Sequence, residues 1–381
     1  MQQRIKNILL LGFIIASFSY CLFTVARIIA VSQLQDFRLY YLGAQSVLRN
    51  KNPYEQVQGV IYPPISLVLL TPFASLPLEF AEDVWTIFSL IALLVSVSLL
   101  LRISETNSTR NFFIVAGLAM LSFPVKFNLG MGQINLFLLL LTCLSFYWYR
   151  RQLPVLAGSA LAIAAALKLT PLVLLVFFLK KRQWRIVISC IVGFIVLNGF
   201  GLTLLGTSAT IDYWQKIFPA IPTVGNAIYY NQALTGWLAR ADMADQVAKV
   251  INYLVFGGML AMSWFIMREK KQLVAVELSE LGLLMISVLV GTGLAWQHHY
   301  VALLVPFFAV SLRAMNLKRS KTKYLVAIGI SYLLVAANLK NPLIIIGIWQ
   351  HIVLSHVLIG AIVLYIVTVI SLRTPMHTER T

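Results

Sequence analysis

The sequence predicts an all-α polytopic membrane protein, and two observations carry this prediction. Hydrophobic residues make up 60% of the 381 residues, charged residues make up only 11%, and the mean hydropathy is +0.85. Soluble domains carry about 25% charged residues, so this chain lacks the polar surface of a soluble protein. Apolar runs that approach the roughly 20 residues needed for a helix to cross a bilayer also recur from one end of the chain to the other.

The apolar runs predict about twelve membrane-spanning helices in a single integral membrane domain over residues 1–381. The first run, 7–30, is too long for a signal peptide and no small-residue cleavage site follows it, so we expect a retained helix. With the N-terminus inside, an even number of spans places both termini in the cytoplasm. The other runs cover approximately 79–102, 112–126, 133–149, 153–167, 170–180, 186–205, 248–267, 273–295, 300–316, 324–340 and 344–372, the last two being the C-terminal spans within 320–381.

The distribution of positive charge supports this topology. The net charge of +17 could also indicate a nucleic-acid partner. Lys and Arg, however, cluster in short gaps between predicted spans, as the positive-inside rule requires of cytoplasmic loops. We therefore expect membrane lipids and no nucleic acid around this charge, in a bacterial cytoplasmic membrane. The clusters lie at 150–151, 180–185, 268–271 and 313–323.

The first long loop on the predicted outer side runs from 31 to 78. Apolar residues from Phe37 to Leu48 follow helical spacing, which predicts an amphipathic helix lying in the membrane interface. Asn52-Pro53-Tyr54 ends this helix. Tyr62-Pro63-Pro64 then opens an apolar run of about 12 residues, which is too short to cross a bilayer and suits a re-entrant or interfacial helix.

Two predicted spans are short, 153–167 and 170–180, and they flank the segment from Lys168 to Pro171. Broken backbone at membrane depth is tolerated only where it is buried in protein or lines a watery cavity. Lys168 could neutralise a phosphate as a mobile point charge, or it could be an interfacial lysine that reaches toward water. A second outer loop, 206–247, carries aromatic side chains suited to the headgroup layer.

Asp36 is the first acidic residue of the chain and lies just past the first predicted span. At the boundary between water and lipid, a carboxylate among aromatic residues can act as a base on a substrate that is half lipid and half polar. The alternative is a helix N-cap that accepts backbone N–H groups, although no Glu or Gln follows at the third position. Ionisable groups at membrane depth are costly and are by default candidates for function.

Lys126 begins a second polar cluster on the predicted outer side, followed by Gly130-Met131-Gly132 and then Gln133 and Asn135. Glycines allow close backbone approach, and the N-terminus of the next helix favours anions. A glycine-rich turn beside a lysine that reaches toward water is the alternative.

His298 and His299 form the remaining cluster, and no motif for a cofactor or metal accompanies them. Adjacent histidines point in different directions, so they are a poor pair of ligands for one metal; one could donate to a phosphate, or both could belong to an interfacial aromatic belt. Walker A, HExxH, Asp-x-Asp and nucleophile-elbow patterns are absent, and the three cysteines fall inside apolar runs. We expect no metal, no cofactor and a substrate that arrives activated on a lipid.

The polar segments together resemble glycosyltransferase family 87, a part of the GT-C superfamily of membrane glycosyltransferases. The resemblance spans about residues 30–310 and rests on the order of the segments along one predicted membrane face. The segments are Asp36 to Gly43-Ala44, Asn52-Pro53-Tyr54, Tyr62-Pro63-Pro64 with Pro72, Gly132-Gln133-Ile134-Asn135, Lys168 with Pro171, Asn231-Gln232-Ala233-Leu234, and Trp296-Gln297-His298-His299 with Pro306.

The resemblance implies a GT-C-type bundle and a transferase that uses a polyprenyl-phosphate sugar, typically mannose, on the outer face of the membrane. The acceptor would be a lipid-linked molecule or a glycan; some members transfer arabinofuranose. Asp36 would be the general base of a single inverting displacement. Lys168, His298, His299 and Lys126 would bind the donor phosphate. The residues implied as substrate contacts are Arg38, Tyr62, Gln133, Asn135, Asn231 and Gln232.

Other functions also fit the sequence. A transporter or flippase of a phosphorylated lipid would use broken helices and buried lysines, but it should carry polar residues through both leaflets, and the inner half offers mainly Glu277 and Glu280. A lipid-linked glycan polymerase or ligase, or a non-catalytic membrane subunit, would also present a polar outer face. The donor class separates the transferase from the polymerase.

Overall fold

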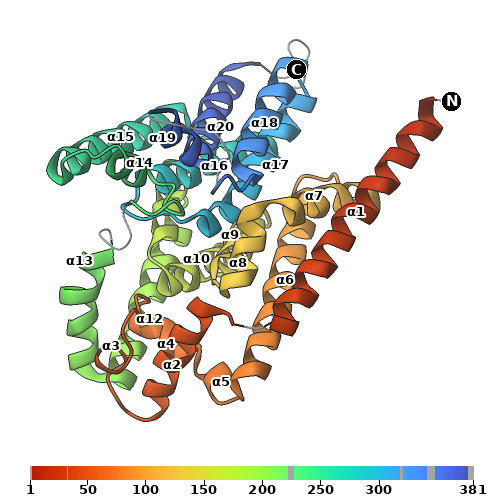
Figure 1. Cartoon of the computed structure of the whole chain (residues 1–381). Coiled ribbons are helices and arrows are strands. Elements are labelled where there is room, and N and C mark those ends of the chain that lie inside the picture. The colour runs from red at the N-terminus through yellow and green to blue at the C-terminus, as the bar shows by residue number, and fades with distance from the viewer. Residues whose placement is uncertain (1, 32, 222–226, 318–320, 341–347, 376–381) are drawn as a thin grey trace. The chain divides into compact units, whose positions relative to one another are not determined.

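The computed structural model describes residues 2–31, 33–221, 227–317, 321–340 and 348–375 (Figure 1). Every regular element in these residues is a helix, and the one strand-like pairing among them is an isolated bridge between Asn231 and Trp296. The expected all-α membrane fold is confirmed.

The chain divides into two compact units, and each contains segments from separate parts of the sequence. Unit 1 comprises Met1–Leu169 and Cys190–Phe218, and unit 2 comprises Thr170–Ser189 and Pro219–Thr381. The expectation of a single membrane domain over 1–381 stays a prediction.

Unit 1 holds the first long helix, the short helices of the first long loop and the helices around the glycine-rich turn. In chain order they are α1 (Gln2–Val31), α2 (Gln35–Leu48), α3 (Pro53–Gln56), α4 (Pro64–Leu69), α5 (Thr71–Ala74), α6 (Leu78–Ile103), α7 (Thr109–Leu121), α8 (Phe123–Met131), α9 (Asn135–Arg150), α10 (Pro154–Leu167), most of α12 (Trp184–Asp212) and the π-helix η2 (Tyr213–Ile217).

Unit 2 holds the segment after the proline-broken tip and the C-terminal helices. They are η1 (Thr170–Leu174), α11 (Leu175–Lys180), α13 (Phe218–Ala220), α14 (Leu234–Arg240), α15 (Asp245–Ile266), α16 (Val274–Gly291), η4 (Gln297–Leu303), α17 (Leu304–Met315), α18 (Lys321–Ala336), α19 (Ile348–Leu354) and α20 (His356–Arg373).

Seven of the described helices are long and apolar enough to cross a membrane, and the number rises to eight if one bent pair forms a single span. This confirms a polytopic membrane protein, whereas the count of about twelve stays a prediction. Two of the expected spans, 153–167 and 170–180, correspond to shorter apolar helices. The expected span 344–372 begins outside the described residues and contains two helices, α19 and α20.

The expected span 112–126 is not one straight helix. α7 ends at Leu121, Ser122 is extended, and α8 starts at Phe123 with a bend of 67°. Pro124 lies in the first turn of α8. Its ring lacks an N–H and would clash with the preceding turn of a continuous helix, so the chain restarts there and reaches the glycine-rich turn in a new direction.

The expected helix in the first long loop is confirmed as α2, and its apolar face packs on protein; its place in the membrane interface stays a prediction. Phe37, Tyr40, Tyr41 and Ala44 are buried in a core that also includes residues of α4, α5 and α6. The apolar run after Tyr62 forms two short helices, α4 and α5, each with a proline in its first turn. The loop is therefore a folded cap over the helices of unit 1.

Trp85 of α6 joins this cap to the turn between α8 and α9. Its ring centroid lies 5.0 Å from that of Phe37 and 4.8 Å from that of Phe137 of α9. Its indole Nε1–H donates to the backbone carbonyl of Gly132 at 2.8 Å. These contacts fix the start of α2 beside the glycine-rich turn.

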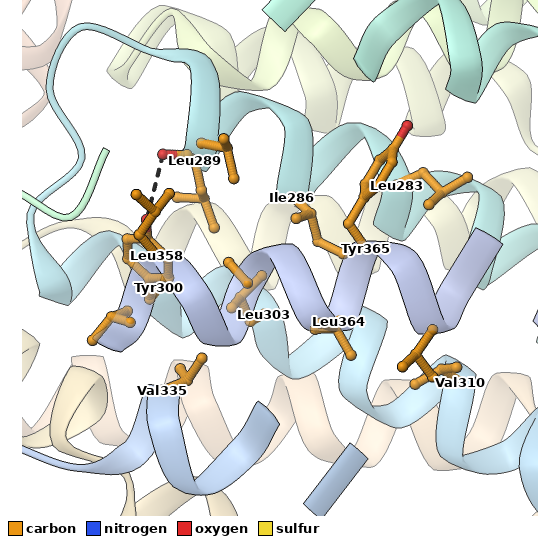
Figure 2. Packing of buried hydrophobic residues seen from close by; sticks show 14 of the residues in the cluster. Leu283, Ile286, Leu289, Tyr300, Leu303, Val310, Val335, Leu358, Leu364 and Tyr365 are labelled. Carbon is orange, nitrogen blue, oxygen red and sulfur yellow. Dashed lines mark hydrogen bonds between the residues drawn. The ribbon is translucent and has the colours of Figure 1, made fainter. Parts of the chain in front are cut away.

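The core of unit 2 includes residues of α16, η4, α17, α18 and α20, whose side chains pack together in Figure 2. The hydroxyl of Tyr300 lies 3.5 Å from the Leu289 carbonyl and donates to the Gln232 carbonyl at 2.6 Å. In lipid, helices associate through close packing and interhelical hydrogen bonds, which favours small residues at their contacts. Gly360 of α20 illustrates this, because its carbonyl accepts from Ser331 Oγ of α18 at 2.7 Å.

Glu277 and Glu280, the main polar residues expected in the inner half, form a buried ion-pair cluster. Both are fully buried on α16, and the Lys181 ammonium lies 2.6 Å from Glu280 and 3.6 Å from Glu277. Backbone N–H groups of Arg268 and Gln272 donate to the same two carboxylates. Removing one partner from a buried ion pair costs about 3–5 kcal/mol, so this cluster ties 170–189 to the centre of unit 2.

Candidate functional site

Asp36 lies in the first turn of α2, whose N-cap is Leu34 and has no side-chain capping bond. The alternative interpretation of Asp36 as an N-cap is therefore wrong. Its carboxylate instead accepts a hydrogen bond from the side-chain amide of Gln133. The side chain is half-buried, and at the N-terminus of a helix a negative charge is favoured by the helix dipole.

Gln133 is held on both sides of its amide. Its Nε2 donates to Asp36, and its Oε1 accepts from the Tyr62 hydroxyl at 2.9 Å. The Tyr62 ring stacks on that of Tyr40, with centroids 3.8 Å apart and planes 11° apart, and both rings are buried. Tyr62, predicted as a substrate contact, thus acts on Gln133 within the protein.

Lys168 follows directly after α10 in an extended conformation. Its ammonium donates to Asn135 Oδ1 at 3.2 Å, and Asn135 Nδ2 donates to Asn128 Oδ1 at 3.1 Å. Asn128 Nδ2 in turn donates to the backbone carbonyl of Gln133 at 3.0 Å. The structure therefore links Asp36 and Lys168 through one chain of amide hydrogen bonds. The two residues are 132 positions apart in the sequence.

Asn128 is the residue of this network that our sequence reasoning did not single out. It is fully buried inside α8. A polar amide within an apolar run at membrane depth is costly unless it is hydrogen-bonded, and that signal could have identified it.

Local structure explains why these residues meet. Gly132 caps α8 with φ +69°, and a Cβ at this position would lie 2.5 Å from Cβ of Phe37. Only glycine allows the turn to approach α2 so closely. At the other end of the site, Ser66 Oγ donates to the carbonyls of Ala166 and Leu167, which satisfies the open end of α10 beside Lys168.

Burial and mutual attraction act in opposite directions on the two charged groups. Asp36 and Lys168 both lie outside the seven spanning helices. Burial raises the pKa of Asp36 above its usual value, while the Gln133 hydrogen bond and the Lys168 charge oppose the rise. Burial lowers the pKa of Lys168 to about 7, opposed by the Asp36 charge. The pair provides a carboxylate that is more basic than usual and a cation that can respond to an arriving anion.

Two other candidates of unit 1 have protein partners. Arg38 Nε donates to Glu82 of α6 at 2.6 Å, and the same carboxylate accepts from the backbone N–H of Leu34. The Lys126 ammonium lies 5.6 Å from the centroid of the Tyr20 ring of α1. Neither residue takes part in the described hydrogen bonds between Asp36 and Lys168, and their proposed contacts with substrate stay predictions.

Asn231 and Gln232 of unit 2 are fully buried and bonded to the backbone. Asn231 Oδ1 accepts from the N–H groups of Ala233 and Ala295. Gln232 Nε2 donates to two carbonyls, those of Tyr229 and Leu354, and its Oε1 accepts from Val357. These amides build the turns of unit 2, and their role in substrate binding stays a prediction.

His298 and His299 belong to η4 of unit 2. The ring of His299 accepts from the Trp296 backbone N–H at 3.1 Å, which caps η4, and the two histidine rings meet edge to face with centroids 4.5 Å apart. His298 is buried and His299 half-buried. Their contact with a donor phosphate stays a prediction. Among the described residues, no three His, Cys, Asp or Glu side chains come together as ligands for a metal ion.

Comparison with known proteins reveals one family and several relatives. The model of the family described as "Glycosyltransferase family 87" matches residues 61–292. This range includes Tyr62, Gln133, Asn135 and Lys168, whereas Asp36 precedes it and the two histidines of η4 follow it.

The relatives are named as glycosyltransferases of mycobacteria. A Mycobacterium tuberculosis protein named polyprenol-phosphate-mannose-dependent alpha-(1-2)-phosphatidylinositol mannoside mannosyltransferase is 26% identical over 73% of this chain and 70% of its own length. The Mycolicibacterium smegmatis protein of the same name is 26% identical over 71% of this chain and 68% of its own. An alpha-(1->3)-arabinofuranosyltransferase of Mycobacterium tuberculosis is 29% identical over 53% of this chain and 48% of its own.

Proposed function

Because this chain belongs to glycosyltransferase family 87, as the match over residues 61–292 shows, we propose that it transfers a sugar from a polyprenyl-phosphate-linked donor to a lipid or glycan acceptor. The membership confirms the resemblance seen in the ordered sequence segments. The mannosyltransferases named above depend on polyprenol-phosphate mannose, which supports this donor class and makes mannose the first choice of sugar. The arabinofuranosyltransferase makes a pentose the alternative.

The proposed reaction is a single inverting displacement. Asp36 takes the proton of an acceptor hydroxyl, and the resulting oxygen attacks the anomeric carbon of the donor sugar. The bond between that carbon and the phosphate oxygen breaks, and its electron pair leaves with the polyprenyl phosphate. A carboxylate base whose pKa is raised above the usual value is better matched to this proton transfer near neutral pH.

The leaving phosphate needs positive charge, and Lys168 is the cation that the amide network links to Asp36. An ammonium held in a partly buried site stabilises developing negative charge more strongly than one in water. By the resemblance to the family, Lys126 and one of His298 and His299 would share this task. We place the reaction on the outer face, with both termini in the cytoplasm, because of the positive-inside distribution of Lys and Arg.

One observation carries this proposal: a half-buried carboxylate and a half-buried ammonium, far apart in the sequence, are joined by a chain of amides. Asp36→Asn tests it, because an asparagine oxygen can still accept from Gln133 and the fold should persist. We expect transfer of labelled mannose from polyprenyl-phosphate mannose, in membranes that supply endogenous acceptors, to fall about 10²- to 10⁴-fold.

Asp242→Asn is the matched control, since Asp242 is exposed and its φ of 53° is also accessible to asparagine. It should transfer sugar as the wild type does. A fully active Asp36→Asn variant would remove the general-base role. Transfer from a polyprenyl-diphosphate-linked glycan alone would instead indicate a polymerase or ligase, and transport without sugar transfer would indicate a flippase.

A further inference from the structure

The turn from Asn128 to Asn135 contains three amide side chains. The sequence suggested Gln133 and Asn135 as substrate contacts and did not single out Asn128. All three are buried, with Asn128 at 0%, Gln133 at 5% and Asn135 at 6% exposure. Every oxygen and nitrogen of their side-chain amides has a partner within the protein. A substrate hydroxyl would therefore have to share or displace an existing bond.

The turn closes on itself. The backbone carbonyl of Asn128 accepts from the Gln133 backbone N–H at 2.9 Å, and Asn128 Nδ2 donates to the Gln133 backbone carbonyl at 3.0 Å. Its Oδ1 accepts from Asn135 at 3.1 Å. The Asn128 side chain thus bonds the backbone of Gln133 and the side-chain amide of Asn135, although neither Asp36 nor Lys168 is its partner.

Each of the other two amides extends from this closed turn to one charged group. Gln133 donates to the carboxylate of Asp36, which comes from α2, and Asn135 accepts from the ammonium of Lys168, which follows α10. A hydrogen bond to the charged form of a group favours that form. Both bonds therefore favour a charged carboxylate and a charged ammonium at one fixed separation.

We infer that the turn from Asn128 to Asn135 is a positioning element, in which Gln133 orients the base, Asn135 orients the cation and Asn128 sets the spacing between them. The chemistry of the two charged groups rests on the proposed function, but the positioning itself does not. Gln133 and Asn135 act through Asp36 and Lys168 rather than on the substrate.

Other titratable groups also face this site and must be considered. Tyr40 of α2 and Tyr62 lie close enough to Asp36 to interact with its charge. On α6, Glu82 pairs with Arg38 and accepts from Leu34, two residues before Asp36. Glu82 has no described hydrogen bond to the turn, whereas Tyr62 donates to Gln133 Oε1 and loses this acceptor in Gln133→Met. Tyr62→Phe therefore separates the effect of the tyrosine on the Asp36 titration from that of the amide.

Gln133→Met removes the amide and keeps the length of the side chain. We expect the titration midpoint of Asp36, followed by infrared difference spectroscopy of the protein in detergent, to rise by about 1 pH unit. The reason is that burial then acts on the carboxylate with one opposing hydrogen bond fewer. Asp36→Asn identifies the carboxyl band, and Gly130→Ala is the control, because a Cβ at position 130 would meet nothing within 4 Å.

Asn135→Leu and Asn128→Leu complete the test. Asn135→Leu should lower the midpoint of Lys168 below about 7, as read from the pH dependence of its modification by an amine reagent, with Lys168→Met as the assignment control. Asn128→Leu should displace both midpoints although it touches neither group. If Asn128→Leu fails to fold, the other two variants decide.

The inference is overturned if Gln133→Met and Asn135→Leu leave both midpoints at their wild-type values and only raise the KM of the polyprenyl-phosphate sugar. That result would make the two amides substrate contacts. The titrations need no substrate, so their outcome is independent of whether the wild-type protein transfers mannose. A wild-type protein without transferase activity would contradict the proposed function and leave the positioning result standing.

Discussion

Asp36 and Lys168 determine what this site can do at the scale of single residues. Each is half-buried, and each has one amide partner that favours its charged form. Burial disfavours both charges, whereas their mutual attraction favours both. The balance leaves a carboxylate with a raised pKa and an ammonium whose pKa is lowered to about 7, and in the proposed reaction these two groups set how activity depends on pH.

We expect a bell-shaped pH profile of kcat/KM. Activity should rise with pH as Asp36 loses its proton, on a limb above the usual carboxylate range, because its pKa is raised. It should fall on a limb near pH 7 as the free enzyme's Lys168 loses its proton, because its pKa is lowered to about 7. Measurement of kcat/KM with polyprenyl-phosphate mannose across both limbs checks this.

Lys168→Arg separates the two limbs. A guanidinium stays protonated throughout this range, so the fall near pH 7 should disappear while the acid limb remains. The absolute rate should decrease, because the planar fork of arginine does not reproduce the geometry of an ammonium. An alkaline limb that is unchanged in Lys168→Arg would mean that another group titrates there.

The turn between α8 and α9 is the decisive element. α8 starts at a bend caused by Pro124 and ends at Gly132, whose carbonyl accepts from Trp85 and whose α-carbon faces α2. The result is that Gln133 and Asn135 emerge beside Asp36 and Lys168. An element of a few residues therefore carries the geometry of the whole site.

Gly132→Ala should disturb this element. The left-handed conformation costs an alanine roughly 1–2 kcal/mol, and the new Cβ would lie 2.5 Å from Phe37 Cβ and 2.9 Å from Leu34 Cβ. Because these atoms belong to the start of α2, we expect a lower thermal unfolding temperature in detergent together with a lower kcat.

Gly130→Ala, in the same turn and with open space around its Cβ, should match the wild type in both measurements. Equal effects of the two substitutions would show that the turn tolerates a side chain at Gly132. The close approach to α2 would then not matter for the site.

At the scale of the whole molecule, the chain is an integral membrane glycosyltransferase whose charge distribution predicts its orientation. Seven described helices can span a bilayer by length and composition, and the loops rich in Lys and Arg are expected inside. Each of the two compact units has a buried core of its own. Orientation matters for the proposed function, in which the polyprenyl-phosphate donor is presented on the same side as Asp36.

Cysteine labelling tests this orientation, because the native cysteines Cys21, Cys143 and Cys190 are buried and give little background. Gln58→Cys, at an exposed position of the first long loop, should react with a membrane-impermeant maleimide in intact cells. Asn107→Cys, exposed between α6 and α7, should react only after the membrane is opened. The reverse pattern would place Asp36 on the cytoplasmic side.

Much of this protein follows from its sequence alone. Apolar runs and sparse charge predict a helical membrane protein, because each helix that crosses a bilayer needs a long apolar segment. The spacing from Phe37 to Leu48 predicts α2, and the ordered polar segments identify the family. These features depend on composition, local spacing or the order of segments, so they can be read from the sequence.

The roles of individual polar residues depended on tertiary structure. Lys126 and Lys168 look alike as interfacial lysines, yet Lys126 lies over the Tyr20 ring while Lys168 joins the amide network. Arg38 was predicted from the sequence as a substrate contact, yet its guanidinium pairs with Glu82 of another helix.

Composition, hydropathy and the ordered polar segments are enough to predict the fold class and the family, and to make Asp36 the first candidate base. The packed helices were needed to show that Asp36 is no N-cap, and that Asn128, Gln133 and Asn135 connect it to Lys168. The physical reason is that a hydrogen bond depends on the distance and direction between two atoms. Segments remote in sequence meet at that distance only when helices pack.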